Sequence, residues 1–391
     1  MGHVKRIPGK TLLFPVLLAL PLLGGLWLGQ RGAPDSSTHS GKTASLGDLR
    51  ACHDVDTSIP ERDECYVSTM HRLLDDNGPQ YVIELDHAAE GDELLGDNCH
   101  VMMHDVAERY VRNHAVTAAN ITTFLPDSNS VNCAAGLTHG LMTEALKSVA
   151  DTDSITGMTA ACEQQGVRIR QINCIHGLGH SFMRATRAHM RRSLALCDKL
   201  GSGNATDCAP GVFHEYFFGI EETAGAAMPA IVMRDPRQLC ASVAARFVRP
   251  CWLRAVQFST PANAEPPSDV GPLVRNVCTN MSAAQRSGCI TAQAFRTSDG
   301  GLDSCFRLAI ADVRSCLLGF NADPTRANVL ESCSQRPTRA RSACYEWFGQ
   351  LHAIFANPPG DRSFCTDLSE PEGVRHCLRG AARARKPLGV L

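Results

Sequence analysis

Residues 196–214 read LCDKLGSGNATDCAPGVFH, a stretch that holds both patterns by which the chain is organised. The first pattern is a pair of cysteines, Cys197 and Cys208, with ten residues between them. The second pattern is His214, which follows the second cysteine by six positions, with Gly211 halfway between them. The cysteine pattern indicates the fold, and the histidine pattern indicates a site.

The residues between the two cysteines predict the end of one helix, a turn and the start of another. Gly201 and Gly203 can adopt the backbone conformations that end a helix. Thr206 or Asp207 can cap the next helix, which we expect to begin at Cys208. A disulfide across this turn would close a helical hairpin near its loop.

Paired cysteines recur through the rest of the chain. From Cys162 onward, successive pairs start 27 to 43 residues apart, which is the length of a two-helix repeat. There are 18 cysteines and no Cys-x-x-Cys knuckle for zinc, so disulfides are their expected use. The expected pairs are Cys52/Cys65, Cys162/Cys174, Cys197/Cys208, Cys240/Cys251, Cys278/Cys289, Cys305/Cys316, Cys333/Cys344 and Cys365/Cys377. Cys99 and Cys133 are left over as a long-range pair, a connection that the spacing leaves open.

These pairs predict an all-α, α-solenoid-like array of disulfide-stapled helical hairpins. We expect a signal anchor or signal peptide over residues 1–30 and a flexible tether, rich in Gly, Ser, Thr and Pro, over 31–47. A histidine-bearing half follows over 48–260, and a cysteine-paired half without the histidine motif covers 273–391. The proline-containing stretch 261–272 is the expected boundary between the two halves.

The N-terminal residues have the pattern of an export signal. An apolar stretch from Thr11 to Gly29 follows several basic residues, and at about 19 residues it is just long enough to span a bilayer. No clear small-x-small cleavage site follows it, which favours an uncleaved anchor. Because the positive flank stays inside, we expect the rest of the chain in the periplasm, at the cell surface or in a secretory lumen.

The charge balance argues against nucleic acid as a partner. The 38 Lys and Arg residues and the 40 Asp and Glu residues give a formal net charge of -2, with no long run of like charges. A hydrophobic content of 44% is enough for a substantial buried core. The expected partners are the membrane, through the anchor, and an exported small molecule or polypeptide as substrate.

A histidine returns six residues after a cysteine four times in the first half: Cys65/His71, Cys133/His139, Cys174/His180 and Cys208/His214. The last three also carry glycine at the third position, on the same helical face as the histidine: Gly136, Gly177 and Gly211. Glycine inside a helix costs about 1 kcal/mol against alanine. The space beside each glycine is therefore expected to hold a ligand, an ion or another backbone.

The later repeats indicate whether the scaffold itself needs histidine. At the same sixth position they carry Gln257, Phe295, Ala322, Gln350 and Arg383. Histidine is therefore separable from the cysteine spacing, which favours a site in the first half over the alternative that one packing position merely tolerates histidine.

More histidines are expected to join this site from a helix beginning at Cys99. His100, His104 and Glu108 share one face of that helix, although the same face could point to solvent. His176, two residues after Cys174, could bind the ion or cap its helix. The predicted metal ligands are His71, His100, His104, His139, His176, His180 and His214. Neutral imidazoles suit a transition metal ion, Cu, Zn or Fe, rather than Ca or Mg.

Three carboxylates near these histidines could act as general acid or base: Glu108, Glu144 and Glu215. Glu144 could instead pair with Lys147 on its own helix. We expect an exported, membrane-tethered metal-dependent enzyme with oxidative or hydrolytic activity. The alternative is a non-catalytic disulfide-rich helical scaffold that binds a protein partner or stores metal.

Overall fold

The computed structural model of the chain describes most of it from Gly47 onward. The described residues are 47–53, 59–79, 81, 84–85, 95–129, 132–146, 152–218, 236–259, 267–297, 302–320, 333–356, 358 and 360–384. Residues 43–391 form one compact unit. The apolar stretch from Thr11 to Gly29 and most of the predicted tether lie outside the described residues.

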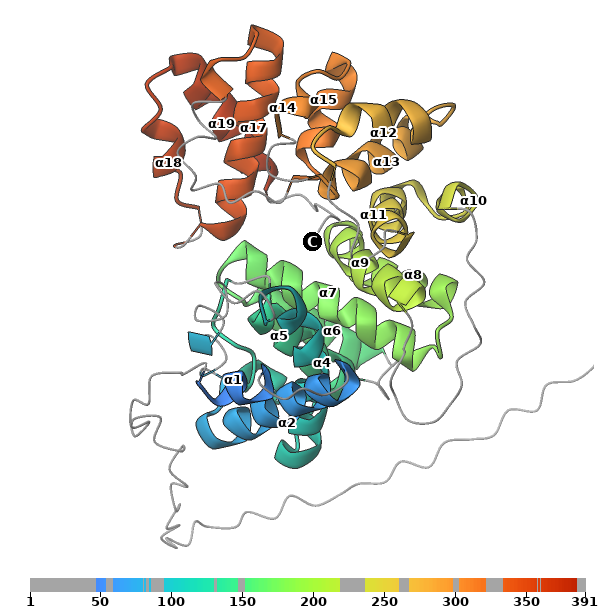
Figure 1. The fold of residues 1–391 in the computed structure, drawn as a ribbon, viewed down its shortest axis with the longest axis vertical. Coiled ribbons are helices and arrows are strands. Elements are labelled where there is room, and N and C mark those ends of the chain that lie inside the picture. Colours follow the sequence, from blue (N-terminus) through green and yellow to red (C-terminus); the bar gives the residue numbers. More distant parts are fainter. Residues whose placement is uncertain are drawn as a thin grey trace, which may run out of the picture. The chain divides into compact units, whose positions relative to one another are not determined.

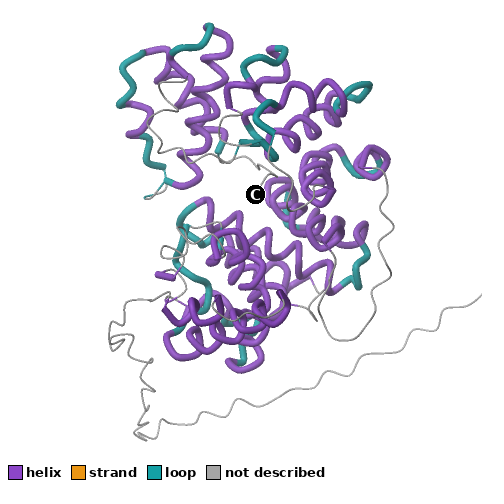
Figure 2. The backbone as a smooth tube through the Cα atoms, viewed as in Figure 1, coloured by secondary structure: helices purple, strands orange, loops and turns teal. Residues whose placement is uncertain are grey.

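Every regular element in these ranges is a helix, as the expected fold class requires (Figures 1 and 2). The first half contains α1 (Gly47–His53), α2 (Ile59–Asn77), α4 (Leu95–His114), η1 (Ile121–Thr123), α5 (Cys133–Leu146), α6 (Thr152–Glu163), α7 (Arg168–Ala185), α8 (Met190–Lys199) and α9 (Ser202–Phe218). The later elements are α10 (Pro236–Ala241), η2 (Ala245–Phe247), α11 (Val248–Ser259), α12 (Val270–Val277), α13 (Ala283–Phe295), α14 (Leu302–Cys305), α15 (Ile310–Leu317), α17 (Thr338–Phe355), α18 (Ser363–Thr366) and α19 (Pro371–Arg383).

Nine disulfides join the 18 cysteines, and no cysteine is free. The eight short-range pairs expected from the spacing are all present. Cys99 and Cys133 form the ninth disulfide, which ties α4 to the start of α5. So many disulfides indicate an oxidising, extracytoplasmic environment.

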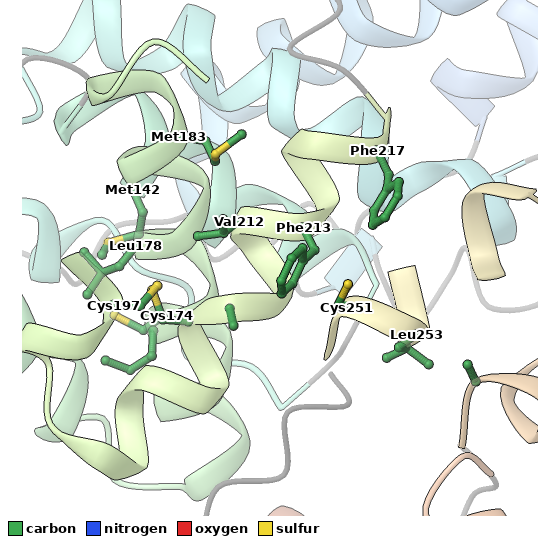
Figure 3. Packing of buried hydrophobic residues seen from close by; sticks show 14 of the residues in the cluster. Met142, Cys174, Leu178, Met183, Cys197, Val212, Phe213, Phe217, Cys251 and Leu253 are labelled. Carbon is green, nitrogen blue, oxygen red and sulfur yellow. A yellow bond between two sulfur atoms is a disulfide. The ribbon is translucent and has the colours of Figure 1, made fainter. Parts of the chain in front are cut away.

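The longer helix of each stapled pair packs on the longer helix of the next. Contacts run from α4 to α5, α7, α9, α11, α13, α15, α17 and α19 in chain order. One contact departs from this order, because α17 also touches α7. Close to the meeting of α5, α7 and α9, Met142, Leu178 and Val212 are fully buried (Figure 3).

Helix α5 is the most enclosed element of the histidine-bearing half. All of its residues except Ala145 are buried, and Glu144 is its single charged side chain. A helix that is apolar all round must be covered on every side. Its neighbours α4 and α7 both pack against it, so its His139 faces the interior whichever way it points.

Helices were expected to start at the second cysteine of each short-range pair, and these starts are wrong, whereas α5 does begin at Cys133 as expected. Helix α11 begins three residues before its cysteine, and seven helices begin six residues before theirs: α2, α7, α9, α13, α15, α17 and α19. Gly201 does end α8, with φ +85°, but that single residue reverses the chain, and Gly203 already lies within α9. Thr206 and Asp207 are therefore interior residues of α9 rather than caps.

Helix α4 likewise begins at Leu95, four residues before the expected start at Cys99. In the part of the chain that the structure describes, we find no helix with the length and apolarity needed to cross a membrane.

Candidate metal centre

Six histidine side chains from four helices meet in the first half of the chain. Their ring centroids lie 4.4–6.3 Å from those of their neighbours. We call these residues the histidine cluster: His100 and His104 on α4, His139 on α5, His176 and His180 on α7, and His214 on α9. Six of the seven predicted ligands are therefore brought together.

Glycines at the helix crossings allow this approach. A Cβ atom at Gly136 would overlap the carbonyl oxygen of His100, and one at Gly211 would overlap that of His176. The helix backbones therefore touch at these crossings with no side chain between them, which brings the flanking rings within reach of each other. A ligand, an ion or another backbone was expected beside these glycines, and the structure shows another backbone.

Two further glycines act in the same way and were missed by the sequence analysis. A Cβ at Gly140 would lie 2.7 Å from the carbonyl oxygen of His104, and one at Gly179 would overlap that of Cys208. The sequence does mark these two glycines, because Gly140 directly follows His139 and Gly179 directly precedes His180. Gly177 differs, since its Cβ would meet the side chain of Met142 at 3.0 Å.

The first group of converging nitrogens, the α4–α5 triad, consists of His100, His104 and His139. One ring nitrogen of each lies within 4.8 Å of the others. His139 Nδ1 is 3.3 Å from His100 Nε2, about the separation (~3.3 Å) of two nitrogens on a tetrahedral ion with bonds of 2.0–2.1 Å. The three rings are inclined to one another by 44°, 67° and 83°. Their in-plane lone pairs are thus not parallel and can be directed at one point.

The second group, the α5–α7 triad, consists of His139, His176 and His180. Again one ring nitrogen of each lies within 4.8 Å of the others. These rings are nearly parallel, with interplanar angles of 8°, 20° and 27°. His139 belongs to both triads, so the two candidate sites share a ligand.

Half of the cluster is buried, and four of its rings are held in the neutral form. The rings of the α5–α7 triad belong to residues that are only 1–2% exposed. Burial lowers the pKa of four members well below the usual value for histidine, and the neighbouring rings act in the same direction: His104, His139, His176 and His214. A neutral imidazole keeps a lone pair on one nitrogen, which is the form that binds a metal.

Three rings of the histidine cluster also lack a hydrogen-bond partner at one nitrogen. The Nε2 atoms of His104, His139 and His180 are buried and unpartnered among the described residues. A buried polar atom left without a partner costs about 1–3 kcal/mol. Three such atoms within one cluster favour a ligand-binding role for the cluster.

Glu215 fixes the orientation of His180. Its Oε1 lies 2.6 Å from His180 Nδ1, and both residues are buried. Ionised Glu215 would accept the Nδ1–H hydrogen bond, which leaves the Nε2 lone pair directed away from the carboxylate. Glu215 is thus placed to orient a ligand and to balance its charge.

The other two candidate carboxylates share an arginine. Arg184 Nη1 lies 3.9 Å from Glu108 Oε2 on α4 and 3.9 Å from Glu144 Oε2 on α5. Lys147, the alternative partner of Glu144, lies outside the described residues. The sequence analysis missed Arg184, although it follows His180 by four residues and so shares its helical face.

Helix α11 presents a second arginine to the cluster. Arg254 stands at the position of the motif glycine and Gln257 at that of the histidine, and Arg254 Nη1 donates to Gln257 Oε1 at 2.7 Å. Burial lowers the pKa of Arg254 to about 10. Its positive charge also contributes to the low pKa of His176 and His214. The feature of the sequence that points to Arg254 is its position three residues after Cys251, where the histidine-bearing repeats carry glycine.

His71 lies apart from the cluster, contrary to its prediction as a ligand. Its Nε2 is 3.5 Å from Asp75 Oδ2 and 3.4 Å from Asn113 Nδ2. Asn113 follows His104 by nine residues on α4, a distance of about 13 Å along a helix axis. Because α2 packs on the far end of α4, the shared cysteine spacing does not bring His71 to the other rings.

Comparison with known proteins adds no family to this description. The chain matches no protein-family model, no curated protein and no solved structure. What the site can do must therefore be argued from its own residues.

Proposed function

We propose that this protein is an exported metalloprotein that binds a transition metal ion in the α4–α5 triad. The observation that carries the proposal is the chelating separation of 3.3 Å between His139 Nδ1 and His100 Nε2. His104 supplies the third imidazole, from a ring steeply inclined to His139. Three nitrogens from two crossing helices would then bind one ion.

The donor set favours Cu, Zn or Fe. All cysteines are in disulfides, so the cluster offers imidazole nitrogens, which suit these ions, and no thiolate. The nearest carboxylates are already engaged with His180 or Arg184. A hard ion such as Ca or Mg prefers several oxygen ligands, which this cluster does not bring together among the described residues.

We favour an enzyme acting on a small exported molecule over one acting on a polypeptide. His139, the ligand at the centre of the cluster, is only 2% exposed, so a bulky chain would not reach its nitrogens without parting the helices. When bound, the ion would supply either Lewis-acid or redox chemistry. Glu144, beside Arg184, is the best placed acid or base, whereas Glu215 would orient His180 and Glu108 would hold Arg184.

The second candidate is a scaffold that holds or stores metal without catalysis. The burial of His139 also favours this candidate, because a ligand shielded from water helps to retain an ion. For either candidate, the export signal pattern at residues 11–29 and the nine disulfides support a place outside the cytoplasm, with the apolar stretch as a membrane anchor. The ordered packing of the stapled helices supports an α-solenoid-like array.

Metal content of the purified, fully oxidised protein tests the proposal. We expect it to contain or take up Cu, Zn or Fe, and copper-loaded protein to show nitrogen hyperfine splitting in its EPR spectrum. His100→Ala and His104→Ala should strongly weaken binding of the ion held by the α4–α5 triad. His71→Ala is the matched control, because it has the same cysteine spacing and lies outside the cluster. A folded protein that refuses all three metals would overturn the proposal.

Activity separates the two candidates. Metal-loaded protein is assayed on small oxidisable and hydrolysable compounds, with Glu144→Gln as the test variant and the surface variant Glu64→Gln as its control. An enzyme should lose turnover in Glu144→Gln while metal content stays unchanged. Absence of any turnover in metal-loaded wild type would favour the storage scaffold.

A further inference from the structure

His139 lies at the junction of the two triads. With His100 and His104 it forms one group of nitrogens within 4.8 Å, and with His176 and His180 it forms another. An imidazole ring has two nitrogens on opposite sides, so a single ring can serve two ions only by giving one nitrogen to each. The shared residue therefore raises the question of how the two nitrogens of His139 are used.

The two nitrogens of His139 have different surroundings. Nδ1 lies 3.3 Å from His100 Nε2, within the α4–α5 triad. Nε2 is buried and has no hydrogen-bond partner among the described residues. The ring of His139 stacks on His176 at 4.4 Å and on His180 at 5.3 Å. The nitrogen that the first triad leaves unused is thus the one available to the second.

The second triad has its own orienting group. Glu215 Oε1, 2.6 Å from His180 Nδ1, holds that ring so that its Nε2, which has no partner among the described residues, can face an ion. A metal-binding histidine commonly gives its other nitrogen to a carboxylate in this way. The carboxylate would also offset part of the charge of a second ion.

We propose that the histidine cluster holds two transition metal ions, one in each triad, bridged by the ring of His139 through Nδ1 and Nε2. This inference rests on the proposed function, since it adds a second ion to the same cluster. Binding of the second ion replaces the N–H proton of neutral His139 with a metal–nitrogen bond, and the proton leaves to solvent. The ring becomes an imidazolate, and neither ion is oxidised or reduced.

The two ions should bind with different affinities. The α4–α5 triad has inclined rings and a nitrogen pair already at chelating distance, so it should fill first. The α5–α7 triad has nearly parallel rings that must turn to direct their lone pairs at one ion. The positive charge of Arg254 near His176 also opposes a second cation.

Copper stoichiometry measured on the full oxidised chain tests the bridge. Protein is dialysed against Cu(II) and its copper counted by elemental analysis, with EPR recorded on the same samples. Wild type should bind two ions per chain, and the EPR signal should be weakened by magnetic coupling through the bridging ring. His71→Ala, the matched control, should behave as wild type.

Variants that remove a ligand from one triad only should distinguish the two sites. His100→Ala and His176→Ala should each retain one ion and show the full signal of an isolated Cu(II). His139→Ala should lose both ions, and His139→Gln, which keeps a polar side chain, provides the same test if the alanine variant does not fold. Circular dichroism and a count of free thiols establish that each variant is folded and oxidised.

Three results would overturn the second ion or the bridge: one ion in wild type, two ions that are magnetically uncoupled, or an ion retained by a folded His139→Ala. One ion in wild type leaves the proposed metal function standing. A wild type that binds no metal overturns the proposed function itself, so the two failures are distinguishable.

Discussion

The α4–α5 and α7–α9 crossings of the first half can be compared with the α17–α19 crossing near the C-terminus. In all three, a glycine three residues after a cysteine packs against a backbone carbonyl: Gly136 on His100, Gly211 on His176, and Gly380 on Glu346. Close approach of helices at such a glycine is therefore not confined to the histidine-bearing half. It does not depend on histidine.

The side chains that flank these crossings differ between the two regions. At the α17–α19 crossing, Glu346 pairs with Arg383, which occupies the motif histidine's position, and also with Arg379 at 3.1 Å. At the first-half crossings the same positions carry neutral imidazoles, of which His139 has an unpartnered Nε2. The C-terminal crossing is therefore completed by its own ion pairs, whereas the first-half crossings keep an unpartnered nitrogen where we propose that a metal ion binds.

The largest expected effect is on metal binding and separates the two regions cleanly. His104→Ala should weaken binding of the tighter ion by more than about 100-fold, since loss of an outer partner alone costs 10–100-fold. Arg383→Met, at the corresponding place of the C-terminal crossing, should leave metal affinity unchanged. Isothermal titration of zinc into apo-protein measures both. Equal losses in both variants would mean that the cluster is not the site.

The next effect tests the packing that the two regions share. Gly136→Ala and Gly380→Ala should each lower the free energy of unfolding by about 1–3 kcal/mol, because the new Cβ forces two backbones apart. Only Gly136→Ala should also weaken metal binding. Denaturant titration and metal titration of both variants measure this.

Gly157→Ala is the control for these substitutions. A Cβ at Gly157, inside α6, would meet nothing within 4 Å. This variant should be as stable as wild type or more stable by up to about 1 kcal/mol. Destabilisation of Gly157→Ala as large as that of Gly136→Ala would remove backbone contact as the explanation.

A smaller effect should follow from Glu215→Gln. The amide can still accept from His180 but carries no charge, so binding at the α5–α7 triad should weaken by about 10–100-fold. Binding at the α4–α5 triad should not change. Zinc titration of this variant should therefore show a weaker second step only, and a weaker first step would contradict the assignment of Glu215 to His180.

The last effect concerns the stability of the apo-protein in mild acid. The pKa of His104, His139, His176 and His214 is lowered in the folded state, so below about pH 6.5 the unfolded chain binds protons that the folded chain refuses. Stability should fall as pH decreases from 6.5, by at most about 1.4 kcal/mol per pH unit for each histidine.

Denaturant titrations of apo-protein at pH 7.5 and 5.5 measure this loss. His139→Ala should reduce it, whereas His352→Ala in the C-terminal region should not. An apo-protein whose stability is unchanged or increased at pH 5.5 would contradict the neutral state of the cluster.

The cysteine spacing predicted the fold well, because a disulfide joins residues that the turn has already brought together. All eight short-range pairs and the helical class followed from it. The residues at which the helices start were harder to predict from the sequence. In α9 the polar residues Thr206 and Asp207 suggested a cap, but Gly201 alone reverses the chain, and the helix begins directly after it.

Six of seven predicted ligands converge because glycine and histidine repeat together on one helical face. His71 failed because its repeat lacks that glycine and packs at the other end of α4. The spacing of Arg184 from His180 and of Arg254 from Cys251 marks a helical face, but the contacts of an arginine depend on which helix lies opposite, and the sequence does not show that. Their importance follows only from the carboxylates and rings that packing places beside them.

X-ray absorption of the zinc-loaded protein tests most directly whether imidazoles from separate helices bind a common ion. We predict a shell of at least three nitrogen scatterers at about 2.0–2.1 Å, with the outer-shell signature of imidazole rings. That shell should be lost in His139→Ala, which removes a ligand from both triads, and kept in His71→Ala. A shell made only of water oxygens, or one that is the same in both variants, would contradict the account.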